Sequence, residues 1–366
     1  MIAGAAPGWR TPTVFHGAGP EATRPPEARG LPRDGVRLLV SGPSGHSHHI
    51  FRDLPRILRP GDLLVVNDSA TLPASLPARP LDRRQAGERF LLNLSTRFGE
   101  RLWLAEPRRS AAEPGPLALR PGDRATAGER TPVTVTFVAP HPGTPRLWFV
   151  TPRAPLEPVM AADGVPIRYG YLPEPQPLDA YQTLFARAPG SAEMPSAGRP
   201  FTRSLVAGLG AAGVDVATLT LHTGVSSLEL PADAGGGSGS LYAEPFTVPA
   251  ATAAAVRRAR RAGGRVIAVG TTVVRALETA AASGEVRSAT GFSRRFVRPG
   301  AVRGAVDGLI TGFHEPSSSH LALLLGLAGQ RMVRGAYAEA VRRGYLWHEF
   351  GDSHLLLWER RARIGP

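Results

Sequence analysis

The stretch RVIAVGTTVVRALE, residues 265–278, decides the fold of this chain. Its first half is a short apolar run rich in β-branched residues, which is typical of a buried strand. Gly270 permits a tight turn, and Thr271 or Thr272 can cap the helix that follows. A strand that leads directly into a helix presents free backbone N–H groups at the carboxyl end of a sheet, where α/β proteins bind ligands. Taken alone, the stretch fits an ordinary structural turn equally well.

The composition predicts a globular protein with a substantial core. The chain has 366 residues, of which 42% are hydrophobic and 20% charged, and this length accommodates two domains. No apolar run approaches the roughly 20 residues of a membrane span, and the opening residues lack the pattern of a signal peptide. We therefore expect a cytoplasmic protein with no membrane partner. The chain contains no cysteine, which excludes disulfides and thiolate metal sites.

The formal net charge of +13 comes from arginine, because the sequence contains no lysine. Arginine pairs well with phosphate, so the charge is compatible with a nucleotide or nucleic-acid partner. A GC-rich genome would give the same abundance of Ala, Gly, Pro and Arg. Charge alone therefore does not identify the partner.

Two kinds of pattern divide the chain. Residues 1–71 and 153–366 alternate apolar strands with helical patterns and predict an α/β main domain, although residues 1–33 resemble an irregular arm. Residues 72–152 contain short strands separated by Gly/Pro-rich turns, with no convincing helix. We interpret this segment as a small all-β domain inserted into the main one. Residues 231–240, PADAGGGSGS, predict a flexible loop or lid.

Polar residues follow four apolar strands of the main domain at the point where each strand ends. They are Asn67-Asp68, His222-Thr223-Gly224, Gly270-Thr271-Thr272 and the run from Thr311 to His314. Because the carboxyl ends of parallel strands meet at one edge, these residues can converge on one pocket. Three other histidines, His46, His48 and His49, are closely spaced, and we interpret them as solvated residues of a polar loop. No metal site is predicted.

At these residues the chain resembles the S-adenosylmethionine:tRNA ribosyltransferase-isomerases of the queuosine pathway. Residues 265–278 match that family almost without change. The other similar segments are RPGDLLVVND (59–68), DAYQTLFARAPGSAEMPSAGRPFT (179–202), TLTLHTGVSS (218–227), VDGLITGFHEPSSSHL (306–321) and AYAEAVRRGYLWHEFGDSHLL (336–356). The resemblance covers most of the chain from about residue 31 onward.

The resemblance implies a barrel-like α/β main domain with an inserted small β-barrel. It also implies S-adenosylmethionine as a substrate, no metal, and transfer and isomerisation of its ribosyl moiety onto 7-aminomethyl-7-deazaguanine in tRNA. A general base, a general acid and partners for the zwitterionic substrate are then needed. The catalytic candidates are His222, His314, Glu278 and Asp352. The substrate-binding candidates are Asn67, Asp68, Gln182, Ser196, Gly198, Thr223, Glu244, Gly270, Thr271, Thr272, Arg275 and Phe313.

The sequence departs from the family pattern where the pattern has Thr-Arg, Leu-His and two further histidines. The residues here are Ser69-Ala70, Arg199-Pro200, Gly239 and Tyr242. Since Pro and Gly cannot move a proton as an imidazole does, we expect inefficient modification of tRNA. Two alternatives to the tRNA-modifying enzyme are a paralogue that uses S-adenosylmethionine on a small-molecule nucleophile or cleaves it, and a non-catalytic protein that binds nucleotide or nucleic acid. Arg275 and Glu278 can also simply pair with each other on one helix.

Overall fold

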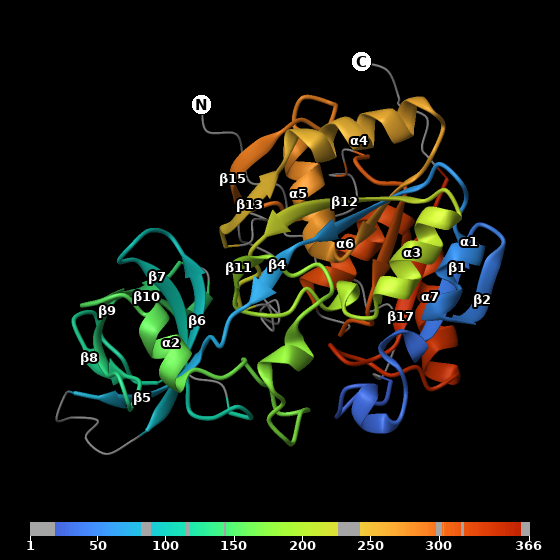
Figure 1. The fold of residues 1–366 in the computed structure, drawn as a ribbon. Coiled ribbons are helices and arrows are strands. Elements are labelled where there is room, and N and C mark those ends of the chain that lie inside the picture. The colour runs from blue at the N-terminus through green and yellow to red at the C-terminus, as the bar shows by residue number, and fades with distance from the viewer. Residues whose placement is uncertain are drawn as a thin grey trace.

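The computed structural model describes residues 19–81, 89–113, 117–142, 144–225, 242–297, 302, 304–315 and 318–359. Figure 1 shows a large α/β domain beside a smaller β-barrel. The predicted lid at 231–240 and the first 18 residues of the predicted arm lie outside the described residues. The described part of the arm packs against the main domain, because Ala22 is buried and its N–H donates to the carbonyl of Trp347.

The main domain contains a nine-stranded sheet. Its strands are β1 (Arg37–Gly42), β2 (Gly45–Ile50), β3 (Leu63–Asn67), β12 (Asp215–Leu221), β13 (Glu244–Val248), β14 (Val266–Val269), β15 (Ala289–Ser293), β16 (Gly308–Thr311) and β17 (Ser353–Leu357). Their order in the sheet is β15-β13-β12-β3-β14-β16-β17-β1-β2. A separate parallel pair joins β4 (Ser69–Thr71) to β11 (Ala188–Ser191).

Helices cover this sheet. They are α1 (Leu54–Ile57), α3 (Arg203–Ala211), α4 (Ala250–Arg261), α5 (Thr271–Ala280), α6 (Ser319–Ala328) and α7 (Gln330–Arg342), with short 3₁₀ turns η1 (Glu27–Arg29), η2 (Arg33–Gly35), η3 (Phe51–Asp53), η5 (Leu178–Tyr181) and η6 (Ser196–Gly198). None of the helices in the described part of the chain is long and apolar enough to cross a membrane.

The centre of the sheet explains why its strands are continuous apolar runs. Leu63 and Val65 of β3 join the core cluster that includes residues of α4 to α7, whereas Leu64 and Val66 join the cluster on the opposite face with residues of α1 and α3. A strand covered on both faces buries every side chain, so both parities of the sequence are hydrophobic. The strands β12, β3, β14 and β16 are adjacent and parallel. Their carboxyl ends therefore lie side by side.

The stretch 265–278 forms the predicted strand and helix, β14 and α5. The predicted threonine cap is wrong, because Thr271 and Thr272 lie inside the helix and the N-cap position is Gly270, without a side-chain hydrogen bond. Gly270 has a φ of 100°, which a residue with a Cβ rarely adopts, so the turn depends on glycine.

The small domain is a closed β-barrel in the strand order β10-β7-β6-β5-β8-β9. Its strands are β5 (Ser75–Pro80), β6 (Phe90–Arg97), β7 (Trp103–Arg108), β8 (Arg124–Ala127), β9 (Val133–His141) and β10 (Thr144–Pro152). The α/β class with an inserted β-barrel is thus confirmed. The domain limits at 72 and 152 stay a proposal, and α2 (Glu157–Asp163) packs Val159 and Met160 into the core of the barrel.

The sequence suggested that the three closely spaced histidines lie in a loop, and this prediction is wrong. His46, His48 and His49 lie on β2, which pairs antiparallel with β1 at the edge of the main sheet. His48 contacts the hydroxyl of Tyr345 through Nδ1 and the carboxylate of Glu339 through Nε2. This Gly- and Ser-rich segment resembles a loop in sequence, but its pairing with β1 makes it a strand.

Candidate functional site

The four adjacent strand ends form the candidate site, and Asn67 connects three of them. Its side-chain amide donates to the carbonyl of Leu221 (2.8 Å), and its oxygen accepts from the N–H groups of Leu221 (3.0 Å) and Ser69 (3.1 Å). The amide nitrogen is also 3.5 Å from Oγ1 of Thr272, at the start of α5. Asn67 therefore fixes the ends of β3 and β12 to each other and to the Gly270 turn. Asn67 is 3% exposed, so these hydrogen bonds are shielded from water.

His222 stands directly after β12 in a network of hydroxyl groups. Its Nδ1 is 2.7 Å from Oγ of Ser69, which is in turn 2.6 Å from Oγ of Ser191. Burial lowers the pKa of His222, and the nearby carboxylate of Asp68 partly opposes that shift. Asp68 itself accepts a hydrogen bond from the hydroxyl of Thr220 (2.6 Å). The imidazole is therefore neutral at pH 7 and oriented by a defined hydrogen bond.

His314 stands beyond β16 in a more apolar environment. Its Nε2 is 2.8 Å from Oγ1 of Thr311, and its backbone N–H donates to the hydroxyl of Tyr337 (3.1 Å). The ring of His320, in the first turn of α6, lies 4.7 Å away. Burial holds the pKa of His314 well below its usual range and lowers that of His320 to about 4. This end of the site thus holds two neutral imidazoles.

A buried ion pair lies between the β12 end and α5. Nη1 of Arg275 donates to Oε2 of Glu244, and Oε1 of Glu244 accepts from the N–H of Gly224 (2.8 Å). Nε of Arg275 donates to the carbonyl of Arg295 (3.2 Å). The remaining nitrogen, Nη2, is buried without a hydrogen-bond partner among the described residues. The positive charge of Arg275 also contributes to the lowered pKa of His320.

Two of the four catalytic candidates have structural contacts. Asp352 accepts from the backbone N–H and the guanidinium of Arg37 (2.9, 2.9 and 2.7 Å) and from the N–H of Leu346 (2.8 Å). Glu278 is fully buried and accepts from the N–H of Ala305 (2.9 Å), with Arg295 3.7 Å away. The alternative of an Arg275–Glu278 pair on one helix is wrong, because Arg275 pairs with Glu244.

The remaining substrate-binding candidates fall into two groups. Ser196 and Gly198 lie in η6, which contacts the Gly270 turn: a Cβ on Gly270 would be 3.6 Å from that of Ala197. Gln182 instead bridges to the backbone of Thr71 through both ends of its amide (3.1 and 2.8 Å). Phe313 is 2% exposed and stacks on His354 at 5.5 Å within the core. The second group therefore supports the fold around the site.

Thr223, Thr271 and Thr272 line the same edge in largely buried positions, each at most 9% exposed. The N–H of Thr223 donates to Oγ of Ser191 (3.0 Å), which extends the hydroxyl network around His222. These threonines therefore belong to the group next to the strand ends.

Sequence reasoning missed four polar neighbours of the site: Ser69, Ser191, Ser95 and His320. Ser95, on β6 of the barrel, accepts from the N–H of Val225 (2.9 Å), so the small domain contributes to the wall. No local pattern marks Ser95, because strand β6 lies far from β12 in sequence. Ser69 directly follows Asn67-Asp68, and that adjacency was a usable signal.

The positions that depart from the family pattern carry contacts of their own. Arg199 is 3% exposed and binds the carboxylate of Glu27 (3.0 Å) and the carbonyl of Ala180 (2.8 Å). The hydroxyl of Tyr242 donates to the carbonyl of Val225 (2.6 Å). Gly239 lies outside the described residues. Arg199 thus anchors the N-terminal arm, and Tyr242 fixes the chain that follows His222.

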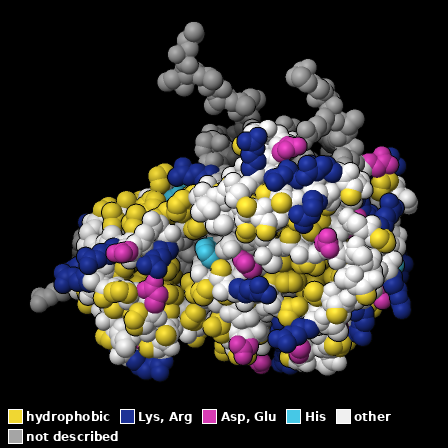
Figure 2. Space-filling model, turned by 45° about the horizontal axis from the view of Figure 1, so that its top comes forward, with side chains coloured by type: hydrophobic (Ala, Val, Ile, Leu, Met, Phe, Trp, Pro, Cys, Tyr) yellow, Lys and Arg dark blue, Asp and Glu magenta, His cyan; other side chains and the backbone are white. Residues whose placement is uncertain are grey.

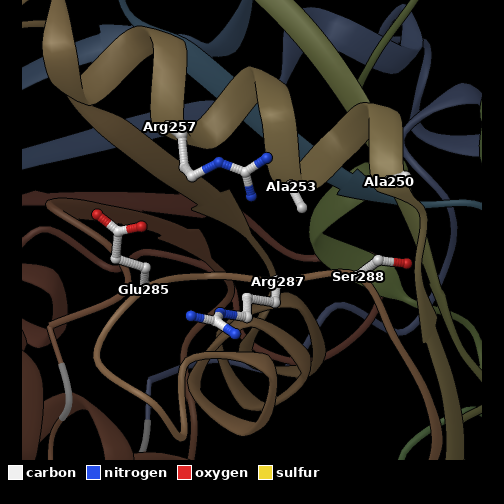
Figure 3. A pocket seen from close by; sticks show the side chains of 6 residues that line it. All are labelled: Ala250, Ala253, Arg257, Glu285, Arg287 and Ser288. Atoms are coloured by element: carbon white, nitrogen blue, oxygen red, sulfur yellow. The ribbon is translucent and has the colours of Figure 1, made fainter.

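A cavity of about 410 Å³ lies elsewhere, between α4 and the segment before β15. Figure 3 shows Arg257 of α4 above this segment, which carries Glu285, Arg287 and Ser288. Arg257 donates to the carbonyl of Val286 (2.9 Å). None of the residues that line the cavity belongs to the four strand ends. Over the described residues, no cluster of three or more His, Asp or Glu side chains suits a metal ion.

Comparison with known proteins shows the family of the chain. Residues 19–356 match the family described as queuosine biosynthesis protein. The chain is 42% identical to the S-adenosylmethionine:tRNA ribosyltransferase-isomerase of Rubrobacter xylanophilus, over 93% of this chain and 95% of that protein. It is 37% identical to the protein of that name from Gloeobacter violaceus, over 89% and 90%.

A solved structure supports the same relationship. The crystal structure of an S-adenosylmethionine tRNA ribosyltransferase from Thermotoga maritima aligns with a TM-score of 0.51 and 28% identity, covering 94% of this chain and 100% of that one. The chain belongs to the queuosine biosynthesis protein family.

Proposed function

We propose that this protein is an S-adenosylmethionine:tRNA ribosyltransferase-isomerase. It transfers the ribosyl moiety of S-adenosylmethionine to 7-aminomethyl-7-deazaguanine in tRNA, rearranges it to an epoxycyclopentane, and releases adenine and methionine. The observation that carries the proposal is the family match over residues 19–356, which includes all four strand ends of the site. The relatives that carry this name align with 93% and 89% of the chain. Nothing in the comparisons favours a small-molecule acceptor or a non-catalytic role.

The two site histidines suit the proton transfers of this reaction. The sulfonium makes the neighbouring ribose carbon acidic, so a base must take a proton there, and an acid must help adenine leave. His222 and His314 are both neutral at pH 7, since burial lowers the pKa of each. Three strand spacings separate β12 from β16, which is roughly 14 Å. At that separation, we propose that each histidine serves a different bond of the substrate.

The Glu244–Arg275 pair suits the zwitterionic end of the substrate. A buried guanidinium nitrogen without an acceptor costs about 1–3 kcal/mol, which a carboxylate from the substrate would recover. Nη2 of Arg275 is such a nitrogen within the described part of the chain. We propose that Arg275 binds the methionine carboxylate, while Glu244 keeps its guanidinium in place. Asp352 and Glu278 then act as structural residues, because their oxygens already accept hydrogen bonds.

The polymer substrate is tRNA in this proposal, and a cytoplasmic location follows from it. The histidines of the family pattern are replaced here by Pro200, Gly239 and Tyr242, and among these Tyr242 has a structural contact, since its hydroxyl donates to the carbonyl of Val225. The activity test described next also measures whether modification of tRNA is efficient or, as we expected from the sequence, inefficient.

The test is incubation of the full chain with S-adenosylmethionine, with and without tRNA that carries the aminomethyl-deazaguanine base. We expect release of adenine and methionine that depends on this tRNA, and a matching mass increase of the tRNA. The same tRNA with unmodified guanine is the control. Release without tRNA, or only with a small amine, would instead support the paralogue, and no thermal shift with S-adenosylmethionine would contradict every enzymatic role.

A further inference from the structure

Five aromatic rings form a continuous row across the junction of the two domains. We call this set, Phe98, His141, Phe149, Tyr242 and Phe292, the aromatic row. The ring of Phe98, after β6 of the barrel, stacks on that of Phe292 in β15 of the main domain at 5.5 Å. Successive centroids along Phe98–Phe149, Phe149–His141 and His141–Tyr242 are 6.0, 5.7 and 6.4 Å apart. All these spacings lie in the range of favourable ring contacts.

The outer end of the row is open to solvent. Phe292 is 50% exposed, and it is the one aromatic residue among the exposed large hydrophobic side chains of the described chain. An isolated exposed apolar residue needs no explanation, but Phe292 terminates a row that runs into the molecule. Figure 2 shows hydrophobic side chains gathered over the upper face of the barrel. The exposed part of Phe292 is therefore accessible to a partner.

The charge beside the row favours a nucleic acid over an apolar partner. Arg294 is exposed two residues after Phe292, and its positive charge contributes to the lowered pKa of His141. Arg294 forms no ion pair with a described residue, and the whole chain carries a net charge of +13. Aromatic faces combined with arginine are the groups by which proteins hold unpaired nucleobases and the neighbouring phosphates.

The inner end of the row reaches the candidate site. The hydroxyl of Tyr242 donates to the carbonyl of Val225 (2.6 Å), and the preceding residue, Gly224, donates to Glu244 (2.8 Å). Gly224 packs so closely that a Cβ there would be 2.5 Å from the Tyr242 hydroxyl and from Oγ of Ser95. The outer end is also close to the candidate site along the sheet, because Phe292 of β15 pairs with Pro245 of β13, the residue next to Glu244.

We propose that the aromatic row is a stacking platform for unpaired bases next to the reacting base of the RNA, with Phe292 as its outermost face. The proposal rests on the proposed function, since it assigns a surface to its polymer substrate. The row supplies affinity through stacking, which tolerates any base sequence. S-adenosylmethionine binds elsewhere, at the strand ends, so the two binding events are separable.

The test compares F292A with F292W and with L81A. Leu81 is 47% exposed near the end of β5, and L81A is the matched control for losing an exposed apolar side chain. We expect F292A to raise the Kd for the tRNA about 10-fold, since one base–aromatic stack contributes that much. F292W and L81A should stay within twofold of wild type, and the KM for S-adenosylmethionine should not change in any variant.

A spectroscopic measurement separates stacking from a structural role. 2-Aminopurine, placed next to the reacting base in the tRNA, should lose fluorescence on binding to wild type and F292W but not to F292A. A lower melting temperature of F292A with unchanged Kd and unchanged quenching would overturn the platform and leave the proposed function intact. Quenching that depends on Phe292 without tRNA-dependent adenine release would retain the platform and contradict the proposed function. If wild type binds no tRNA, both are wrong.

Discussion

His222 and His314 stand at the ends of two parallel strands, yet their surroundings differ in polarity. His222 is bonded to Ser69 in a chain of hydroxyl groups, and the carboxylate of Asp68 stabilises its protonated form. The ring of His314 has one hydroxyl partner, Thr311, and its neighbours include three other imidazoles, which all disfavour a positive charge. The same residue type in the same topological position thus has two different acid–base properties.

We propose that this difference assigns different proton transfers to His222 and His314. In the proposed mechanism, His222 accepts a proton and passes it on through the neighbouring hydroxyl groups. His314 stays neutral over a wider range of pH, because desolvation dominates its pKa. In the proposed mechanism, this difference in environment and the distance between the strands assign the two histidines to two different bonds.

The largest effects are expected from substitutions that remove each site histidine separately. H222A and H314A should each lower kcat about 10²–10⁴-fold, because each removes a proton-transfer group. H49A is the control, since His49 lies on β2 and its imidazole bonds to Ser47 (2.9 Å) far from the strand ends. Rates of adenine release, measured at saturating substrates, would check this. If only one variant loses activity, the division of work between the two ends is wrong.

Removal of Glu244 tests the buried charge at the His222 end. E244A should lower the free energy of unfolding by about 3–5 kcal/mol, because Arg275 is then left buried without its carboxylate partner. The counterpart at the His314 end is Y337F, which removes one hydrogen bond to the N–H of His314 and should cost about 0.5–1.5 kcal/mol. Urea unfolding of both variants measures the difference. Equal losses would show that the two ends are held equally strongly.

Displacement of the imidazole should matter less than its removal. In G190A the added Cβ would be 2.5 Å from Nδ1 of His222, so we expect the imidazole to be displaced from its hydrogen bond with Ser69. We expect kcat to fall up to about 10²-fold, since small misplacements of catalytic groups have effects of that size. G210A is the control, because nothing lies within 4 Å of a Cβ on Gly210 in helix α3. Unchanged kcat in G190A would contradict the dependence of the rate on this position of His222.

Acid should destabilise the region around His354, which lies beside the His314 end. Burial lowers the pKa of His354 from about 6.5 to about 3. Below pH 6.5 the unfolded chain therefore binds a proton that the folded chain excludes, and stability falls as the pH drops towards 3. The slope is at most about 1.4 kcal/mol per pH unit for one histidine. Urea midpoints between pH 7 and 4 should fall less steeply for H354Q, and an identical slope would contradict the assignment.

The main elements of the fold were predictable because they are encoded locally. The runs around Leu63 and Val266 are apolar at every position, as expected of strands covered on both faces, and both became central strands. The prediction of a threonine cap for α5 was wrong, because the N-cap position is Gly270, which has a positive φ and no side chain that could cap the helix. The prediction of a loop for the histidines of β2 was wrong, because this segment pairs with the preceding strand β1 in a tight hairpin.

The sequence by itself determined the α/β class, the inserted barrel, the family resemblance and the four polar strand ends, since each depends on spacing along the chain. Only the tertiary structure decided which polar residues share partners. It paired Arg275 with Glu244 instead of Glu278, placed Asp352 on Arg37, and brought Ser95 and Phe98 of the barrel to the main domain. Such contacts join residues far apart in sequence, and hydrogen bonds and ring stacking form only after packing has fixed their distances and desolvated them.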